Sequence, residues 1–316
     1  MSKTALNLSQ NKSKFAGSIL LLALFIVPFF SFAKSEKIYV DDNASGTENG
    51  SQSHPYKTIK SALKHADDGD KVIVKPGTYK ENVEVPEEVK LIGESNSKVI
   101  IEAKDDDDPT VYLRDDSEVN NVTIKNGKSG VKVKENAEAK ILSCIIRNND
   151  GNGIEVKSGK VEKKSEVVIS GNVIKENGRK GIFSERRYIS IINNEIKGNK
   201  NDGVDIARGS YVSLEGNLIK ENRGSGLKLV LDGSSVWTKN NRLAENKREG
   251  VEVNAYGGSG KIVFKSSKFV KNDRYGIARI IRGNAGSAVF NGMTVESSVE
   301  LWENAIGNIS PIIRVQ

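Results

Sequence analysis

Cysteine, histidine, proline and aromatic residues are all scarce in this 316-residue sequence. It contains one cysteine, two histidines, six prolines and 6% aromatic residues. A single cysteine excludes an internal disulfide framework, and two histidines leave little room for histidine-based metal or acid–base chemistry. Thirty glycines without a three-residue period exclude a collagen-like chain, and 37% apolar residues are too many for a fully disordered one.

Only one apolar run is long enough for a signal peptide or a membrane anchor, and it lies at the start of the chain. Three lysines precede the run over residues 15–32, and Ser31-Phe32-Ala33 fits the small-x-small pattern of a signal-peptidase site. We predict a cleaved signal peptide over residues 1–33 and export to the extracellular or periplasmic space. An uncleaved anchor is the alternative, since about 20 apolar residues span a bilayer. After cleavage we expect no membrane contact.

The charge balance of the exported chain argues against nucleic acid as a partner. Residues 34–316 carry 45 basic and 41 acidic side chains, a net charge of +4. No basic stripe interleaved with aromatic residues is apparent in the sequence. Nothing in the sequence specifies an oligomeric state.

An internal repeat is the strongest signal in the sequence. A glycine followed by an alternating triplet, usually with apolar first and third residues, recurs every 22–28 residues. The glycines are Gly130, Gly153, Gly181, Gly203, Gly226, Gly250 and Gly276. Two asparagines five residues apart precede several of them: Asn172 and Asn177, Asn194 and Asn199, Asn217 and Asn222, Asn241 and Asn246. Degraded pairs are Cys144 with Asn149 and Ser267 with Asn272, and Asn121 with Asn126 extends the pattern upstream.

Each repeat unit predicts three short strands, because apolar residues alternate with period two. In one unit these strands are 166–170, 173–175 and 181–184. Stacked units predict a parallel β-solenoid with strands about 4.8 Å apart. One interior row is Val131, Ile154, Ile182, Val204, Leu227, Val251 and Ile277, and another is Ile174, Ile196, Ile219, Leu243 and Phe269.

The asparagines have a structural interpretation. Asparagine tolerates left-handed backbone conformations and can bond both turn backbone and the asparagine one coil away. We therefore predict ladders of asparagines rather than catalytic groups. Cys144 occupies a ladder position, which predicts a buried, unreactive thiol.

The opening of the exported chain resembles a known module. Residues 38–93 include Pro55-Tyr56-Lys57-Thr58-Ile59, Pro76-Gly77-Thr78-Tyr79 and Leu91-Ile92-Gly93. This is similar to the opening module of secreted right-handed parallel β-helix proteins of the pectate lyase-like (pectin lyase fold) superfamily, over residues 37–300. Residues 58–66 have apolar positions on one helical face, which predicts a short helix over the N-terminal end of the solenoid.

The predicted fold is therefore all-β, a single right-handed parallel β-helix over residues 34–316. We divide it into a cap module at 37–93, repeat coils at 94–286, and a degraded last coil with a tail at 287–316. The superfamily includes lyases, epimerases, hydrolases and proteins without known activity, so the resemblance indicates the fold more than the function.

The resemblance implies that substrates lie along the strands that follow the repeat glycines. The outward row there is Lys132, Glu155, Phe183, Asp205, Lys228 and Glu252. We take Asp205, Lys228 and Glu252 as candidate catalytic residues, and Glu155, Phe183, Arg208 and Trp237 as candidate substrate-binding residues. Coil spacing places Asp205 and Glu252 about 10 Å apart, close to the separation in inverting glycosidases.

A second chemistry is β-elimination of a uronate, in which Arg208 would neutralise the substrate carboxylate. Residues 201–205 resemble the Asn-x-Asp segment of polygalacturonases, but the paired-aspartate and Gly-His-Gly motifs of those enzymes are missing. The Asp-Pro-His motif of mannuronan epimerases is missing as well. The alternative interpretation of the charged row is a solvated surface with pairing between strands.

Four acidic clusters are candidate calcium-binding sites. They are Asp41-Asp42, Asp67-Asp68-Asp70, Asp105–Asp108 and Asp115-Asp116. Calcium takes six to eight oxygens arranged around a point, and a linear run of aspartates supplies few of them. A loop that interrupts edge pairing is the alternative for Asp105–Asp108.

Three functions remain open from the sequence. The first is a secreted protein that binds polysaccharide, acidic rather than neutral, without catalysis. The second is a carbohydrate-active enzyme, a lyase, epimerase or hydrolase of acidic glycans. The third is a structural or adhesion module of the cell surface.

Overall fold

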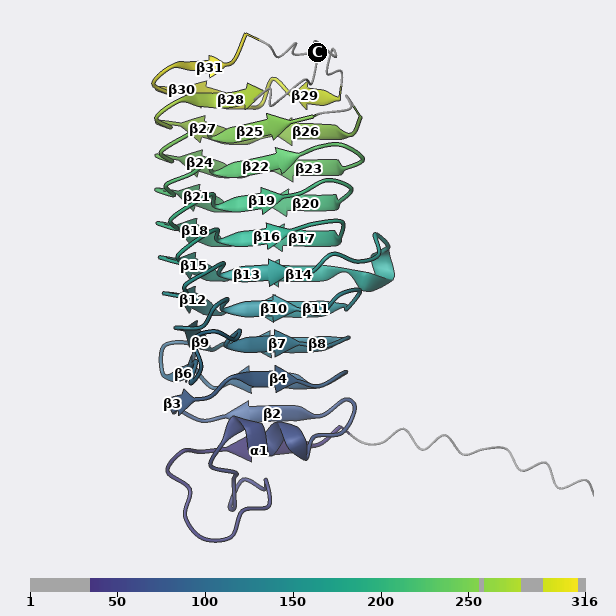
Figure 1. Cartoon of the computed structure of the whole chain (residues 1–316), viewed down its shortest axis with the longest axis vertical. Helices are drawn as coiled ribbons and strands as arrows, with labels where there is room; N and C mark the ends of the chain where they lie inside the picture. The colour runs from purple at the N-terminus through teal and green to yellow at the C-terminus, as the bar shows by residue number, and fades with distance from the viewer. Residues whose placement is uncertain (1–34, 256–258, 280–291, 312–316) are drawn as a thin grey trace, which may run out of the picture. The chain divides into compact units, whose positions relative to one another are not determined.

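The computed structural model describes residues 35–255, 259–279 and 292–311, and these form a parallel β-solenoid with three sheets (Figure 1). Every strand pairs in parallel with the strand one coil away. This arrangement confirms the predicted stack of three-stranded coils. Residues 1–33, and with them the predicted signal peptide, lie outside the described residues.

Each sheet takes one strand from nearly every coil. Sheet A contains β1 (Lys37–Val40), β2 (Lys71–Val74), β5 (Lys90–Gly93), β8 (Ser117–Asn120), β11 (Ala139–Leu142), β14 (Val167–Ser170), β17 (Tyr188–Ile192), β20 (Tyr211–Glu215), β23 (Ser235–Lys239), β26 (Lys261–Lys265) and β29 (Met293–Val295). Sheet B contains β3 (Gly77–Lys80), β6 (Val99–Glu102), β9 (Thr123–Lys125), β12 (Ile145–Arg147), β15 (Val173–Lys175), β18 (Glu195–Lys197), β21 (Leu218–Lys220), β24 (Arg242–Ala244), β27 (Lys268–Val270) and β30 (Glu300–Trp302). Sheet C contains β4 (Val83–Val85), β7 (Val111–Leu113), β10 (Val131–Val133), β13 (Ile154–Val156), β16 (Ile182–Ser184), β19 (Val204–Ile206), β22 (Leu227–Val230), β25 (Val251–Asn254), β28 (Tyr275–Arg279) and β31 (Gly307–Ile309).

The core is the stack of aliphatic rows inside the coils. Both predicted rows lie there, with side chains no more than 2% exposed. The repeat glycine lies where the chain enters sheet C, and no side chain fits at that position. A Cβ on Gly203 would lie 2.4 Å from Ile219 and 2.7 Å from the Gly226 carbonyl oxygen. Close packing of successive coils therefore explains why the repeat contains glycine.

Two asparagine ladders run through the turns on either side of sheet B, as predicted. One consists of Asn172, Asn194, Asn217 and Asn241, and the other of Asn149, Asn177, Asn199, Asn222, Asn246, Asn272 and Asn304. In each ladder the side-chain amide donates to the asparagine of the next coil and to a backbone carbonyl inside the turn. Buried turn groups are thereby paired.

The sequence analysis associated the ladder asparagines with a left-handed backbone, and the structure places that conformation one residue earlier. The residue before each ladder asparagine has the positive φ, as at Glu176 (57°) and Glu221 (56°). Asn121 and Asn126 are themselves left-handed, with φ of 59° and 65°. They therefore stand one position before the ladders, and Gly127 donates its N–H to Asn149 in the ladder register.

Cys144 fills the predicted ladder position and is 1% exposed. Its backbone N–H donates to Oδ1 of Asn172 at 2.8 Å. Burial raises the pKa of its thiol to about 12. The thiol therefore stays protonated at neutral pH, as expected for an unreactive cysteine.

A short helix α1 (Ile59–Lys64) lies at the N-terminal end of the solenoid (Figure 1). Its apolar side chains Ile59, Ala62 and Leu63 join the core. The Glu81 carboxylate accepts hydrogen bonds from the N–H groups of Ile59 and Lys60, at 2.9 Å each. The helix thus covers the first coil, whose edge would otherwise be open.

Candidate functional site

The six residues of the predicted outward row lie on consecutive strands of sheet C. The parallel register pairs Lys132 with Glu155, Glu155 with Phe183, and onward through Asp205, Lys228 and Glu252. Exposure differs along the row, however. Asp205 is 5% exposed and Glu252 is fully buried, so the interpretation of this row as a solvated surface is wrong for these two carboxylates.

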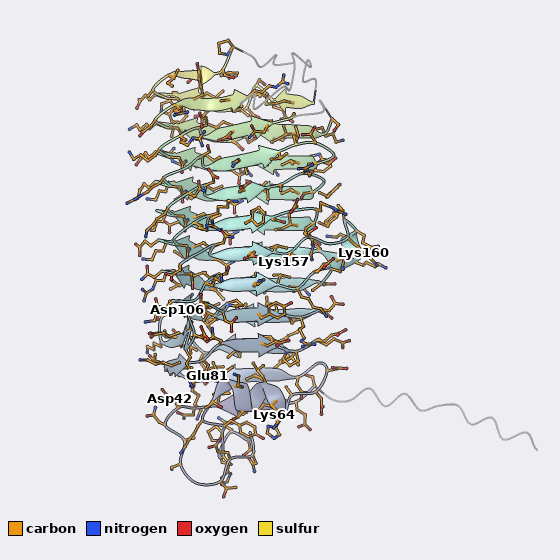
Figure 2. All side chains as sticks on the ribbon, viewed as in Figure 1. Asp42, Lys64, Glu81, Asp106, Lys157 and Lys160 are labelled. Atoms are coloured by element: carbon orange, nitrogen blue, oxygen red, sulfur yellow. The ribbon has the colours of Figure 1, made fainter. Side chains whose placement is uncertain are left out.

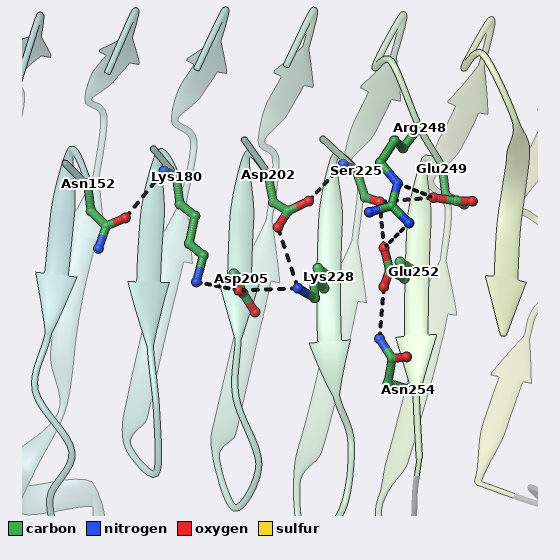
Figure 3. A network of polar contacts seen from close by, with 10 residues as sticks. All are labelled: Asn152, Lys180, Asp202, Asp205, Ser225, Lys228, Arg248, Glu249, Glu252 and Asn254. Atoms are coloured by element: carbon green, nitrogen blue, oxygen red, sulfur yellow. Dashed lines mark hydrogen bonds and ion pairs between the residues drawn. The ribbon is translucent and has the colours of Figure 1, made fainter. Parts of the chain in front are cut away.

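A second polar row runs beside the first, and sequence analysis missed most of it. It is formed by the residue directly before each of the first six repeat glycines: Ser129, Asn152, Lys180, Asp202, Ser225 and Glu249. The signal was present in the sequence, because every one of these positions is polar. From Asn152 in this row and Asp205 in the first row onward, the two rows join in one network of polar contacts (Figure 3).

Two carboxylates and two lysines form one half of this network. Lys180 lies 2.7 Å from Asp205 Oδ2. Lys228 lies 3.8 Å from the same oxygen and 3.9 Å from Asp202 Oδ2. Oδ1 of Asp202 accepts the N–H of Ser225 at 2.9 Å. Two carboxyl groups therefore share the Lys228 ammonium on an otherwise buried patch.

The pKa of Asp202 lies above its ordinary value. Burial is the main cause, and the negative charges of Asp205 and Glu252 add to it, whereas the Ser225 N–H and Lys228 act in the opposite direction. A carboxyl group with a raised pKa beside other carboxylates is found in acid–base sites, but networks of buried ion pairs also perturb pKa values.

This shift predicts a pH-dependent stability difference for Asp202→Asn. Since the folded pKa is raised, ionised Asp202 costs stability above its unfolded pKa of about 4. The amide keeps the acceptor for Ser225, so we expect a higher melting temperature than wild type at pH 7. The gain should vanish near pH 3, where Asp202 is protonated in both states. Melting curves at the two pH values test this, and an equal gain at both would contradict it.

Two buried glutamates form the other half of the network. Glu249 and Glu252 are 1% and 0% exposed. The Ser225 hydroxyl lies 3.1 Å from an oxygen of each. Arg248 reaches both carboxylates, at 3.5 Å and 3.2 Å. Asn254 donates to Glu252 at 3.0 Å. Each glutamate is therefore held by several partners.

The predicted substrate-binding residues lie on three different parts of the surface. Glu155 belongs to the row, where its carboxylate binds Lys157 at 3.1 Å and accepts from Ser129. Phe183 has the Lys180 ammonium 4.2 Å from its ring centre. Arg208 is exposed and forms no ion pair with any described residue, so the structure does not bring it to Asp205.

Trp237 lies on sheet A and not beside the charged row. Its ring is tilted by 42° against that of Tyr211, with the ring centres 4.7 Å apart, and Tyr211 stacks on Tyr188 at 4.4 Å. The Lys261 ammonium lies over the Trp237 ring, 5.0 Å from its centre. A sugar stacks on a ring face, and Tyr211 and Lys261 already contact this ring. Its edge remains for a ligand.

An open hollow lies towards the N-terminal end, and sequence analysis did not find it. Its larger part lies between helix α1 and the turns that lead from sheet B to sheet C, and its smaller part reaches the sheet C row at Lys132. Two adjoining parts measure about 730 and 450 Å³. Lys60, Lys80, Lys104 and Lys132 line them, and none of these lysines forms an ion pair with a described residue. Tyr112 adds an aromatic side chain. The hollow forms because residues 103–109 fold beside helix α1, which a strand pattern does not reveal.

The acidic run Asp105–Asp108 forms one wall of this hollow, with Asp106 and Glu81 labelled at this end in Figure 2. The carboxylates of Asp105, Asp106 and Asp107 lie within 4.8 Å of one another and are exposed. Three carboxylates supply fewer oxygens than calcium takes. Calcium binding therefore stays a prediction, which isothermal titration with calcium would test.

Sequence comparison places the chain in a family. The model of the right-handed β-helix region matches residues 109–227 and 160–294, more than half of the chain. The protein therefore belongs to the right-handed β-helix family, as its resemblance to the pectin lyase fold implied. No curated protein matches the sequence.

Three solved structures that share the fold belong to proteins named for their action on polysaccharides. An alginate lyase from Paenibacillus sp. str. FPU-7 superposes with a TM-score of 0.60 at 12% identity, covering 87% of this chain and 97% of the lyase. A mannuronan C-5 epimerase A-module from Azotobacter vinelandii gives 0.55 at 14% identity, over 80% and 93%. Pectate lyase Pel9A gives 0.57 at 13% identity, over 87% and 80%. At such identities the likeness shows the fold alone.

No helix in the part of the chain that the structure describes is long and apolar enough to cross a membrane.

Proposed function

We propose that this protein is exported and binds an acidic polysaccharide on the outward face of sheet C. The observation that carries the proposal is the hollow in which Lys60, Lys80, Lys104 and Lys132 form no ion pair with any residue that the structure describes, although carboxylates also line it (Glu81, Glu84, Asp105, Asp106 and Asp108). Free ammonium groups suit the carboxylates of a uronate, and Tyr112 offers an apolar surface for a sugar ring. The polysaccharide-active proteins of the same fold support the ligand class.

Binding without turnover is supported by the state of the candidate catalytic groups. Asp205 is held between two lysines, Lys228 between two aspartates, and Glu252 is fully buried under Arg248. A general acid or base must reach the proton that it transfers. Groups that are paired and covered in this way serve the stability of the face better than they serve chemistry.

The binding proposal predicts a loss of affinity for the double variant Lys104→Gln and Lys132→Gln. Each removed ion pair with a uronate is worth up to about 1 kcal/mol, so polygalacturonate should bind roughly tenfold more weakly. Isothermal titration or surface plasmon resonance measures this. Lys160→Gln with Lys164→Gln removes the same charge from the exposed loop at 157–165 and should bind as wild type does. Equal affinity of both double variants would contradict the proposal.

Catalysis on the same face is the second candidate, and the raised pKa of Asp202 beside Asp205 favours it. In an enzyme Asp202 would donate a proton, Asp205 and Lys228 would contact the sugar, and Glu252 and Arg208 would assist. Turnover of alginate or pectate that falls at least a hundredfold in Asp205→Asn would establish this function. Turnover unchanged by that substitution would remove Asp205 from the reaction.

The proposal of export depends on the signal peptide predicted over residues 1–33. N-terminal sequencing of the protein recovered from the medium or periplasm should begin at Lys34. Retention of the full N-terminus in a membrane fraction would favour the anchor instead.

A further inference from the structure

Sheet B carries a row of basic side chains that runs along the solenoid. Lys125, Arg147, Lys175, Lys197 and Lys220 occupy the same position on β9, β12, β15, β18 and β21, and the parallel register pairs each with the next. Neighbouring strands lie about 4.8 Å apart, so one positive charge recurs at that interval over five coils. The sequence did not reveal this row, because its members lie 22–28 residues apart.

The surrounding turns enlarge the positive surface. Lys200, Arg223 and Lys247 follow the second asparagine ladder on successive coils and are exposed. The strands of sheet B from β9 to β27, with their turns into sheet C, contain 16 basic and 8 acidic residues: 123–129, 145–152, 173–180, 195–202, 218–225, 242–249 and 268–275. This net charge of +8 exceeds the +4 of residues 34–316 as a whole, so the rest of those residues are net negative.

Neighbouring acids neutralise the row incompletely. Lys125 binds Glu102, Lys175 binds Glu176, Lys197 binds Glu195 and Lys220 binds Glu221, at 2.7–3.7 Å. Arg147 forms no ion pair with a described residue. Like charges opposite one another on adjacent strands destabilise a sheet. Four of the five are paired with an acid, so the positive excess of this surface comes from Arg147 and from exposed turn residues such as Lys200 and Arg223.

Apolar side chains lie beside the charges on the same strands. Ile145, Val173 and Leu218 stand two residues before Arg147, Lys175 and Lys220 and are partly exposed. Glu195 interrupts this apolar row between Val173 and Leu218. A uronan presents both carboxylates and the apolar C–H faces of its sugar rings, and this pair of parallel strips matches both. Duplex DNA winds its phosphates around its axis, so only some of them would meet a straight row.

We propose that sheet B is a second binding surface, which takes a linear polyanionic glycan along the basic row. The inference rests on the proposed ligand class but not on the sheet C hollow. With glycan-binding surfaces on two sheets, one molecule would bind two chains, or two segments of one chain, at once. The gain in overall affinity then depends on both surfaces being occupied together.

The test is the triple variant Arg147→Gln, Lys175→Gln and Lys197→Gln. Its matched control is Lys160→Gln, Lys164→Gln and Lys239→Gln, which removes three charges outside sheet B. Polygalacturonate, dextran and duplex DNA are titrated against both variants, wild type and the Lys104→Gln, Lys132→Gln variant. Of the two triple variants, we expect only the first, the row variant, to bind polygalacturonate about tenfold more weakly and with a shallower salt dependence. Its melting temperature should not fall below that of wild type. Dextran should bind to none of the proteins.

Several results would overturn the inference. Wild-type affinity of the row variant, or an equal loss in its control, would show that the row is not a site. DNA binding as tight as polygalacturonate binding, with the same loss, would assign the row to nucleic acid instead. If only the Lys104→Gln, Lys132→Gln variant lost affinity for polygalacturonate, the proposed function would stand and the sheet B surface would be ruled out. If wild type did not bind polygalacturonate, both the proposed function and this inference would be ruled out.

Discussion

Replacing Asn222 with alanine is expected to lower the free energy of unfolding by about 3–5 kcal/mol. Its Oδ1 accepts from the backbone N–H and the side-chain amide of Asn199, at 3.1 and 2.9 Å. Its amide donates to the Ile196 carbonyl and to Asn246, both at 3.1 Å. The substitution leaves donors and acceptors of three coils unpaired in a dry interior, where each unpaired group costs about 1–3 kcal/mol.

Asn201→Ala is the matched control. Asn201 is exposed in the same turn of the preceding coil, so its replacement should change stability by no more than about 0.5 kcal/mol. Urea denaturation of the two variants measures the difference. A loss below about 1 kcal/mol for Asn222→Ala would mean that the ladder contributes little to the solenoid.

The second large effect is expected for Arg187→Met. Arg187 is fully buried, although arginine is almost never found so. Its guanidinium donates to the carbonyl oxygens of Lys134, Lys157 and Ser165, at 3.2, 2.9 and 3.2 Å, and to that of Ala137. Burial lowers its pKa, yet the four carbonyls hold the charged group. Methionine fills the space but leaves these carbonyls without a donor, at a cost of about 3 kcal/mol.

Two readouts separate this role from mere packing. The carbonyls of Lys157 and Ser165 belong to the two ends of the loop that protrudes from the solenoid (Figure 2). Arg187→Met should therefore make that loop more susceptible to proteolysis as well as lower the urea midpoint. Arg208→Met, at an exposed position, should change neither. A stable, protease-resistant Arg187→Met variant would contradict the assigned role.

The fold could be predicted from the sequence because successive coils repeat the same sequence pattern. The glycine, the aliphatic triplet and the paired asparagines recur together, and each has a local physical reason. The upstream pair Asn121 and Asn126 misled the register by one position, because asparagine suits both the left-handed residue and the ladder residue that follows it.

The candidate site was less predictable. Period-two alternation correctly put Asp205 and Glu252 on the outward side, but it does not say that neighbouring side chains cover them. The sequence analysis did not single out Arg187, which is interior in the structure. The hollow and the basic row depend on which coils and loops lie side by side, and that information comes only from stacking.

Nuclear magnetic resonance of alginate and polygalacturonate mixed with the protein tests the central claim most directly, with and without calcium. Binding without turnover predicts broadened sugar resonances at unchanged chemical shifts, and sharper lines when Lys104 and Lys132 are glutamine. New resonances of unsaturated, epimerised or shortened sugars would contradict the claim and establish an enzyme. Spectra unaffected by the protein would contradict it in the other direction, by excluding these glycans as ligands.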